Sequence, residues 1–295
     1  MLLKFWDKNK IALLFLTPWL IGITALGIIP MMASLYLSFT EYDMFKAPTW
    51  VGLQNYKELF ISDGRFTQSM KVTFQYVFIG VPLQLIMAFC LALFLNTGVK
   101  GISGFRAIYY VPSLLGPSLA IAILWRQIFG MDGIVNKFLA LFGITPNSWI
   151  SDPETTLYTL IILLVWQFGS PMVIFLAGLK QIPKDLYEAA SIDGAGPFTR
   201  LFKITIPMLS PIIFFNLVMQ LIGAFQAFTP AYIIGGQTGG PLDSTLFYTL
   251  YLYIKAFTEF QMGYASAMAW ILLIIIATFT GILFAVSKKW VHYES

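Results

Sequence analysis

Six long stretches of the chain carry no charged residue, and polar segments separate them. The stretches are residues 11–40, 72–99, 107–125, 155–179, 204–242 and 260–287. Each is long enough for a membrane-spanning helix, which needs roughly 18 residues or more. The fifth stretch has the length of two spans, but Pro207, Pro211, Pro230 and the glycine-rich residues 235–241 limit it to one span. The pattern therefore predicts an all-α integral membrane protein with six transmembrane helices.

Composition agrees with a lipid environment. The chain has 295 residues, of which 58% are hydrophobic and 11% charged, whereas a soluble domain has about 25% charged residues. The first stretch follows Lys4, Lys8 and Lys10 and is open to a second reading, as a signal peptide. Its apolar length exceeds the roughly 7–15 residues of such a segment, and no small-residue cleavage site follows directly. We interpret it as a retained first helix.

Basic residues are distributed unevenly between the two sides of the predicted bundle. If the N-terminus is inside, the inner segments contain Lys4, Lys8, Lys10, Lys100, Arg106, Lys180, Lys184, Arg200, Lys203, Lys288 and Lys289. The outer segments contain fewer, namely Lys46, Lys57, Arg65, Lys71, Arg126, Lys137 and Lys255. The positive-inside rule then favours cytoplasmic positions for both termini. No loop gathers a basic cluster, so no nucleic-acid partner is expected.

Polar side chains and prolines inside the apolar stretches indicate what faces the interior of the bundle. Asn216 and Gln220 share one helix face, which the small residues Gly223, Ala224 and Ala227 continue, while Gln226 lies off this stripe. Polar residues also occur in the third and fourth stretches, with the aromatic Trp166 beside them: Ser113, Ser118, Gln167 and Ser170. Amides and hydroxyls facing lipid are unfavourable, so these side chains should face inward.

Two interior roles remain open for these polar side chains: hydrogen bonding between helices, or lining a solute pathway. A sugar requires amide, hydroxyl and aromatic partners, and these helices offer all three. The candidate pathway residues are Ser113, Ser118, Trp166, Gln167, Ser170, Asn216, Gln220, Ala224 and Ala227. Pro112, Pro117 and Pro171 free backbone carbonyls that lipid cannot satisfy, so each marks either an ordinary kink or a wet cavity.

The sequence contains no recognisable catalytic or nucleotide-binding motif. The dipeptide Gly-Lys of a phosphate-binding loop does not occur. One cysteine, Cys90, and one histidine, His292, provide no metal-binding or nucleophilic cluster. No acidic or basic residue lies deep in an apolar stretch, which argues against an ion-coupled carrier. We expect no cofactor, no metal and no enzymatic activity, and any uphill movement of a solute then takes its energy from another subunit.

Residues 182–207 form a charged segment between the fourth and fifth stretches. Pro183 suits the first position of a helix, and Asp185 and Glu188 suit its N-terminal turns. Gly194 fits a left-handed C-terminal stop, and Pro197 begins a second short helix that extends over residues 198–204. Two readings stay open: an amphipathic segment on the membrane surface, or a compact knob that a partner grips.

The same segment carries a recognisable motif. Glu188-Ala189-Ala190, three residues, Gly194, nine residues, Ile204 and Pro207 resemble the pattern of permease subunits of binding-protein-dependent ABC importers. Ile206 stands where that pattern prefers leucine. The fuller text of residues 187–197 is similar to the carbohydrate branch, the maltose and glycerol-phosphate type. Other stretches agree with it: Phe105-Arg106, Tyr110-Val111-Pro112, Gly239-Gly240-Pro241, Ser244-Thr245 and residues 263–267.

The resemblance implies a type I importer permease fold, in a bacterial cell membrane. Residues 1–71 would hold the first helix and an outer loop, residues 72–287 five core helices, and residues 288–295 a cytoplasmic tail. The implied partners are a second homologous permease (a heterodimer), a cytoplasmic ABC ATPase dimer, an extracytoplasmic solute-binding protein and a carbohydrate. The implied ATPase-coupling residues are Tyr187, Glu188, Ala189, Ala190, Asp193, Gly194, Ala195, Gly196, Pro197 and Pro207. The alternative is a stand-alone carrier or channel for a small polar solute, which usually shows coupling charges or pseudo-symmetric halves.

Overall fold

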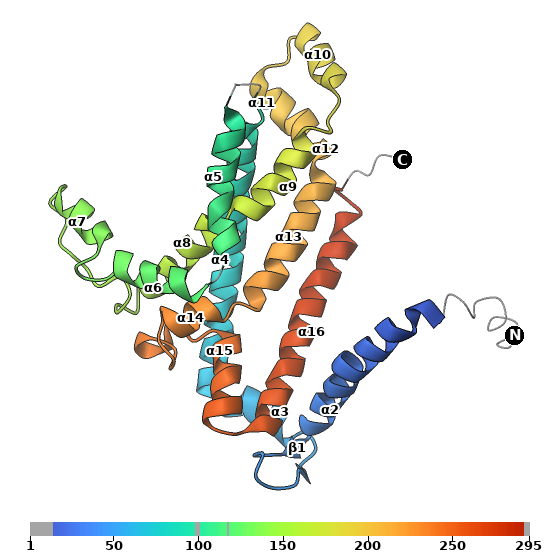
Figure 1. The fold of residues 1–295 in the computed structure, drawn as a ribbon, viewed down its shortest axis with the longest axis vertical. Coiled ribbons are helices and arrows are strands. Elements are labelled where there is room, and N and C mark those ends of the chain that lie inside the picture. Colours follow the sequence, from blue (N-terminus) through green and yellow to red (C-terminus); the bar gives the residue numbers. More distant parts are fainter. Residues whose placement is uncertain (1–13, 98–100, 117, 292–295) are drawn as a thin grey trace, which may run out of the picture. The chain divides into compact units, whose positions relative to one another are not determined.

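The computed structural model describes residues 14–97, 101–116 and 118–291, and it is built mainly of helices (Figure 1). Lys4, Lys8, Lys10, Lys100, Pro117 and His292 lie outside the described residues. After a helix that begins at Leu14, the elements are η1 (Thr24–Ile28), α2 (Ile29–Leu37), β1 (Thr40–Glu41), β2 (Thr49–Trp50), α3 (Gln54–Ile61), α4 (Gly64–Leu95), α5 (Ile102–Leu115), α6 (Leu119–Ile128), α7 (Ile134–Ala140), α8 (Thr156–Trp166), α9 (Gly169–Leu179), α10 (Lys184–Ile192), α11 (Pro197–Arg200), η2 (Leu201–Thr205), α12 (Ile206–Met208), α13 (Ser210–Phe225), α14 (Thr229–Ile233), η3 (Pro241–Asp243), α15 (Tyr248–Tyr253), η4 (Ile254–Thr258) and α16 (Met262–Ser287).

Five helices of the described chain are long and apolar enough to cross a membrane. They are Leu14–Leu37, Gly64–Leu95, Thr156–Leu179, Ser210–Ile233 and Met262–Ser287. The predicted third span is a bent pair, because α5 and α6 meet at an angle of 103°. Counting that pair as one broken span gives six, which confirms the predicted number. The second span begins earlier than its charge-free stretch, because the residues around Arg65 and Lys71 are also helical.

The chain divides into two compact units. Unit 1 contains the described residues up to Asp63 together with Leu252–Leu272, and unit 2 contains Gly64–Tyr251 and the residues from Leu273 onward. The segment that leads into α16 belongs to unit 1, and the predicted division of the chain at residue 71 stays a prediction. We describe each unit separately.

Unit 1 joins a short hairpin to the start of α16. The strands pair antiparallel, with Thr40 opposite Trp50. The Asn55 side chain Nδ2 donates to the carbonyls of Ser38 and Thr40 at 2.9 and 3.0 Å. A Cβ atom on Gly263 would overlap the Thr40 carbonyl, so only glycine permits this approach. The helix Leu14–Leu37 buries none of its most apolar window, as a lipid-facing span would.

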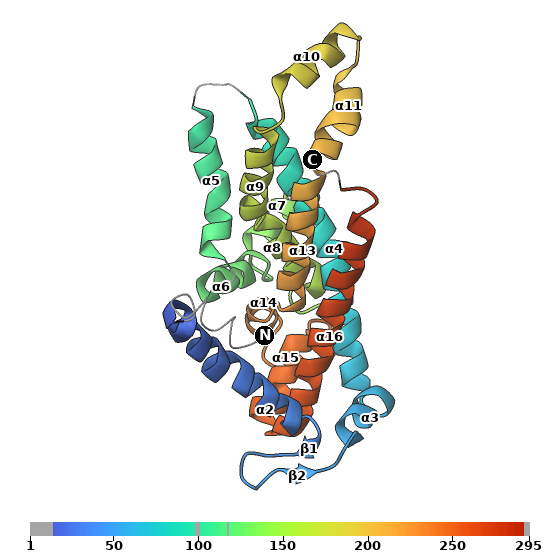
Figure 2. The ribbon, with the colours of Figure 1, turned by 90° about the vertical axis from the view of Figure 1, so that its right-hand side faces the viewer.

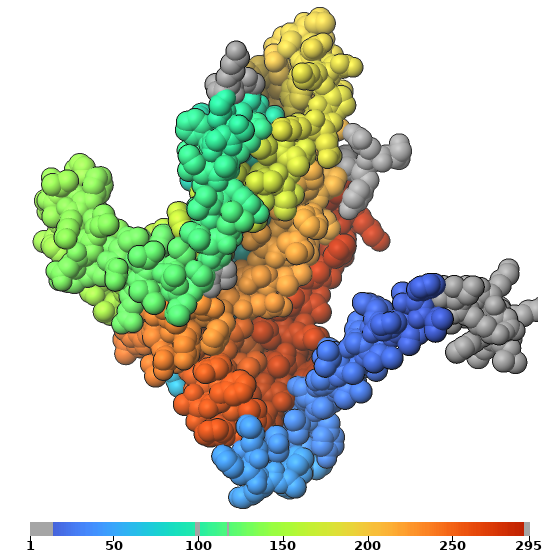
Figure 3. Space-filling model, in the orientation of Figure 1, coloured from blue at the N-terminus to red at the C-terminus, as the bar shows by residue number. Residues whose placement is uncertain are grey.

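Unit 2 is a bundle in which α4 packs against α8, α9 and α13 (Figures 1 and 2). Close packing depends on small residues: a Cβ atom on Gly178 would meet the side chains of Leu209 and Ile212. Figure 2 shows α10 and α11 beyond the ends of α9 and α13, and Figure 3 shows the α10 segment, in yellow, projecting from this bundle. The bundle therefore carries a protruding loop at the end where α9 stops and α13 begins.

Candidate functional site

A break in the fourth span brings three helices together around one carbonyl. Pro171 has no N–H group, so the Gln167 carbonyl loses the intrahelical donor that four residues later would supply. Gln84 Nε2 and Ser113 Oγ donate to this carbonyl instead, at 3.1 and 3.0 Å. Ser113 Oγ in turn accepts from the Ser170 N–H at 3.0 Å, an N–H that the first turn of α9 leaves free. Side chains of α4 and α5 thus satisfy the backbone groups at the break.

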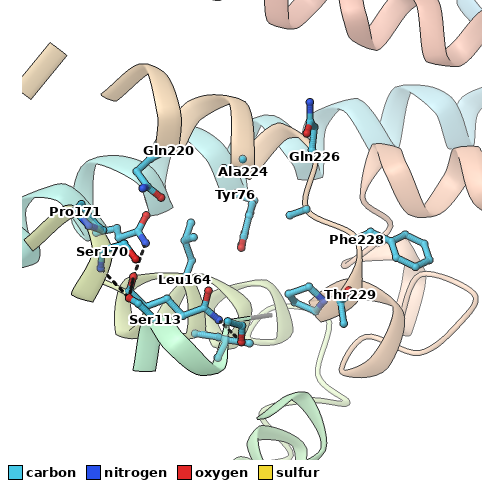
Figure 4. A pocket seen from close by; sticks show the side chains of 17 residues that line it. Tyr76, Ser113, Leu164, Ser170, Pro171, Gln220, Ala224, Gln226, Phe228 and Thr229 are labelled. Carbon is cyan, nitrogen blue, oxygen red and sulfur yellow. Dashed lines mark hydrogen bonds between the residues drawn. The ribbon is translucent and has the colours of Figure 1, made fainter. Parts of the chain in front are cut away.

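A cavity of about 450 Å³ opens beside this break (Figure 4). Its wall comes from unit 2 and consists of Tyr76, Gln84, Ser113, Gly116, Leu163, Leu164, Gln167, Ser170, Pro171, Gln220, Gly223, Ala224, Gln226, Ala227, Phe228, Thr229 and Pro230. Within the described residues, no lysine, arginine, histidine, aspartate or glutamate belongs to this wall. A solute in the cavity would therefore be held by hydrogen bonds and aromatic contact, not by ion pairs.

The structure brings six of the nine candidate pathway residues into this one wall: Ser113, Gln167, Ser170, Gln220, Ala224 and Ala227. Their contact with a solute stays a prediction. Figure 4 shows Gln220 and Tyr76 on the cavity side of their helices, with Ser113 and Ser170 at the break.

The other three candidates lie outside the wall of this cavity, and each has a structural position of its own. Ser118 caps α6, where its Oγ accepts from the Ile121 N–H at 3.3 Å. The Trp166 ring lies 5.7 Å from the Trp125 ring. Asn216 is completely buried, and its Nδ2 donates to the Pro171 carbonyl at 3.5 Å. Of the two interior roles, interhelical hydrogen bonding describes Asn216. Trp166 makes an interhelical ring contact, and Ser118 caps its own helix.

Sequence reasoning also missed several wall residues. Gln226, which the helical stripe excluded, lines the cavity because α13 ends at Phe225 and the helical period no longer applies beyond it. The same turn brings Phe228, Thr229 and Pro230 to the wall. The sequence offered a reason to expect Gln84 in the wall, because it is an amide inside a charge-free stretch. Nothing in the sequence pattern distinguishes Tyr76.

The protruding loop has the predicted helix stop at its centre. Gly194 has a φ of 73°, which confirms the left-handed conformation. The Ala195 N–H donates to the Ala190 carbonyl at 2.8 Å and the Gly194 N–H to the Ser191 carbonyl at 3.1 Å. These two bonds form a Schellman motif at the end of α10. Pro183 precedes α10 as its N-cap and is not its first residue, so that prediction was off by one position.

The second half of the loop is less regular than expected. The predicted helix over residues 198–204 consists of α11 and the π-helical turn η2. Pro197 is the first residue of α11, as predicted. The Tyr187 hydroxyl lies 2.9 Å from Thr205 Oγ1, and Arg200 Nε donates to the Ala195 carbonyl at 2.8 Å. The first bond connects α10 to the end of η2, just before the fifth span, and the second connects α11 to the turn that follows α10.

The loop presents an apolar surface. Ile192, Phe198 and Phe202 are 87%, 76% and 64% exposed, and the carboxylates of Glu188 and Asp193 are exposed beside them. Of the predicted coupling residues, Tyr187, Ala190, Ala195 and Pro207 are half-buried, and Glu188, Ala189, Asp193, Gly194, Gly196 and Pro197 are exposed. Large exposed apolar side chains rimmed by polar residues are typical of protein contact sites.

The chain combines apolar helices long enough to span a membrane, an uncharged polar cavity and a protruding loop, an arrangement that fits a permease-type transport protein. The family of the binding-protein-dependent transport system inner membrane component matches residues 61–292, and the chain belongs to this family. Members of this family are permease components of ABC importers and are not themselves catalytic. Membership favours an importer subunit over a stand-alone carrier or channel.

Individual relatives agree with this assignment. The probable ABC transporter permease protein YesP of Bacillus subtilis is 57% identical, over 95% of this chain and 91% of that protein. The lactose transport system permease protein LacF of Rhizobium radiobacter is 32% identical, over 97% and 96% of the two chains. A chain in the crystal structure of a bacterial alginate ABC transporter, in complex with an alginate pentasaccharide-bound periplasmic protein, has a TM-score of 0.83. It is 19% identical and covers 97% of this chain and 96% of its own, so it shows the same fold.

Proposed function

We propose that the protein is one permease subunit of a bacterial carbohydrate ABC importer and forms half of its translocation pathway. The observation that carries the proposal is the cavity, whose amides, hydroxyls and aromatic ring suit a sugar. Its wall, as far as the structure describes it, contains no acidic or basic side chain. Relatives named for lactose and for trehalose and maltose transport support the same class of solute.

The protruding loop is the proposed contact with a cytoplasmic ATPase dimer. Its exposed apolar side chains provide area for docking, and its bonds to the start of the fifth span provide rigidity. In this arrangement ATP-driven closure of the ATPase dimer moves the loop, and the loop moves the helices around the cavity. A second, homologous permease supplies the other half of the pathway, and an extracytoplasmic binding protein delivers the sugar.

The orientation follows from the same assignment. If the loop meets a cytoplasmic ATPase, its side of the bundle is cytoplasmic, and six spans place both termini there. The excess of lysine and arginine in the same segments supports this orientation.

Reconstitution tests the proposal. The cognate binding protein is purified with its bound solute, the solute is identified by mass spectrometry, and its uptake into liposomes is measured with both permeases, the ATPase and ATP. We expect a carbohydrate and strictly ATP-dependent uptake. Liposomes with this chain alone are the control. Concentration of the sugar by the chain alone, or a bound solute that is not a carbohydrate, would refute the proposal.

A further inference from the structure

A second pocket, of about 530 Å³, lies beside α6 and α14, and we call it the outer pocket. Its wall comes from two segments of unit 2, the loop that contains α7 and the glycine-rich loop after α14. The wall includes Arg126, Ser148, Ser151, Ile234, Gly235 and Gly236. Helices α6 and α14 are neighbours and lie far from α10 (Figures 1 and 2). If the protruding loop is cytoplasmic, as proposed, the outer pocket lies toward the side from which the binding protein delivers the sugar.

A buried asparagine holds the first segment in place. Asn136 is 2% exposed. Its Nδ2 donates to the carbonyls of Gly130 and Met131 at 3.3 and 2.9 Å, and to that of Asn147 at 2.8 Å. Gly130 and Met131 belong to the wall, and Asn147 directly precedes Ser148, which does too. One side chain thus fixes both ends of the loop where they border the outer pocket.

The glycine-rich segment is held by side chains of its own. Arg65 at the start of α4 donates to the Thr238 carbonyl at 2.9 Å. Thr245 Oγ1 donates to the Gly239 carbonyl at 3.0 Å. A Cβ atom on Gly236 would meet nothing within 4 Å, so the wall is open beside this residue. Both segments are therefore fixed without a ligand, and preformed pockets of this kind are typical of small-molecule sites.

The chemistry of the outer pocket suits a sugar. The hydroxyls of Ser148 and Ser151 have no hydrogen-bond partner within the part of the chain that the structure describes. Arg126 is exposed and is the only charged residue in the described part of the wall. A guanidinium has five N–H donors and no acceptor, so it can bind the oxygens of a carbohydrate. A few directional polar partners among apolar side chains are the usual composition of a ligand pocket.

Helix α14 connects the outer pocket with the cavity. Thr229 and Pro230 border the cavity, and Ile234 borders the outer pocket, so the two walls are about 6 Å apart along this helix. We propose that the outer pocket is a second carbohydrate subsite, an assignment that rests on the proposed function. The transported carbohydrate is then an oligosaccharide, and one unit occupies the outer pocket while another reaches the cavity. Binding of the first unit raises the effective concentration of the next one at its own site.

The test varies the outer pocket and the length of the carbohydrate together. Ser151→Trp fills part of the outer pocket and keeps the backbone N–H that donates to the Ser148 carbonyl. ATP-driven uptake is measured in proteoliposomes that contain both permeases and the ATPase. The solutes are the oligosaccharide that the binding protein retains and its fragments down to a single unit. We expect the uptake rate of the longest chain to fall about tenfold, the value of one or two hydrogen bonds, and that of the single unit to stay unchanged.

Two further variants separate sugar contact from a general structural role. The double variant Ser148→Ala with Ser151→Ala removes only the two hydroxyls and should lower uptake of the longest chain about fivefold. Ser62→Trp is the same type of substitution at an exposed serine outside the wall, and it should leave uptake of every chain length unchanged. Copurification of the ATPase and the second permease is measured for each variant to show that the complex assembles.

Equal losses for every chain length would overturn the second subsite, as would normal uptake of the longest chain by Ser151→Trp and by the double variant. A binding protein that retains only a monosaccharide would overturn the oligosaccharide assignment and leave the proposed function standing. A wild type that takes up no carbohydrate would instead refute the proposed function itself.

Discussion

The conformation of Gly194 makes the coupling role of the loop testable with one substitution. Its φ of 73° is left-handed, and a Cβ atom there would meet nothing within 4 Å. Gly194→Val therefore acts through the backbone alone. A left-handed residue with a Cβ costs about 1–2 kcal/mol, with a β-branched side chain at the upper end of that range. The ratio of loops that keep the Schellman turn to loops that lose it then falls roughly 5- to 30-fold, and we expect weaker binding of the ATPase.

The assay measures how much ATPase copurifies with the tagged permease, together with ATP-driven uptake. Gly194→Val should lose most of both, and Gly194→Asn should retain most of both, because asparagine tolerates the left-handed region. Gly52→Val is a matched control, since Gly52 has a φ of 60° and equally open space in the loop before α3. It should be strained to a similar degree without weakening ATPase binding. Wild-type association and uptake by Gly194→Val would refute the coupling role of this turn.

Three further predictions concern the bundle of unit 2. Gln220→Leu should impair sugar uptake and leave complex assembly intact; normal uptake would remove this residue from the pathway. Gly178→Val should lower stability by about 1–3 kcal/mol through overlap with Leu209, visible as a lower Tm in detergent, and an unchanged Tm would contradict the packing. Arg65→Ala removes a partly exposed bidentate pair with Asp243 at 2.7 and 2.9 Å. It should speed amide exchange in residues 235–246 with less than ~1 kcal/mol of global destabilisation, and unchanged exchange there would argue against this brace.

The spans were predictable because a long stretch without charged residues can be seen in the sequence itself, without knowledge of how the helices pack. The left-handed turn at Gly194 was predictable for a similar reason, since a glycine after a short amphipathic helix has a local geometric meaning. The position of the bend between α5 and α6 was not, because α5 continues through Pro112 to Leu115 and the helix ends at Gly116, which has a φ of 53°. A proline indicates that a helix can be interrupted, but packing decides where the direction changes.

The cavity was only partly predictable, because helical periodicity applies within a helix and fails at its end. Gln220 and Ala224 follow the period of α13 and line the cavity as the stripe predicted, whereas Asn216 is one turn earlier and lies buried against the Pro171 carbonyl. Gln226 comes after the helix has ended and enters the wall against the pattern. The position of a polar residue relative to a helix end therefore matters as much as its face.

The break at Pro171 explains why this bundle places polar side chains deep in a membrane. A helix without the proline would have satisfied the Gln167 carbonyl internally, and Gln84 and Ser113 would then be amide and hydroxyl groups without a backbone partner in an apolar environment. With the proline, the carbonyl needs donors from neighbouring helices, and the donors it recruits fix α4 and α5 to the fourth span. Other polar side chains near the break, those of Gln167, Ser170 and Gln220, line the cavity. A local defect in one helix thus produces both the connection between helices and the polar wall of the cavity.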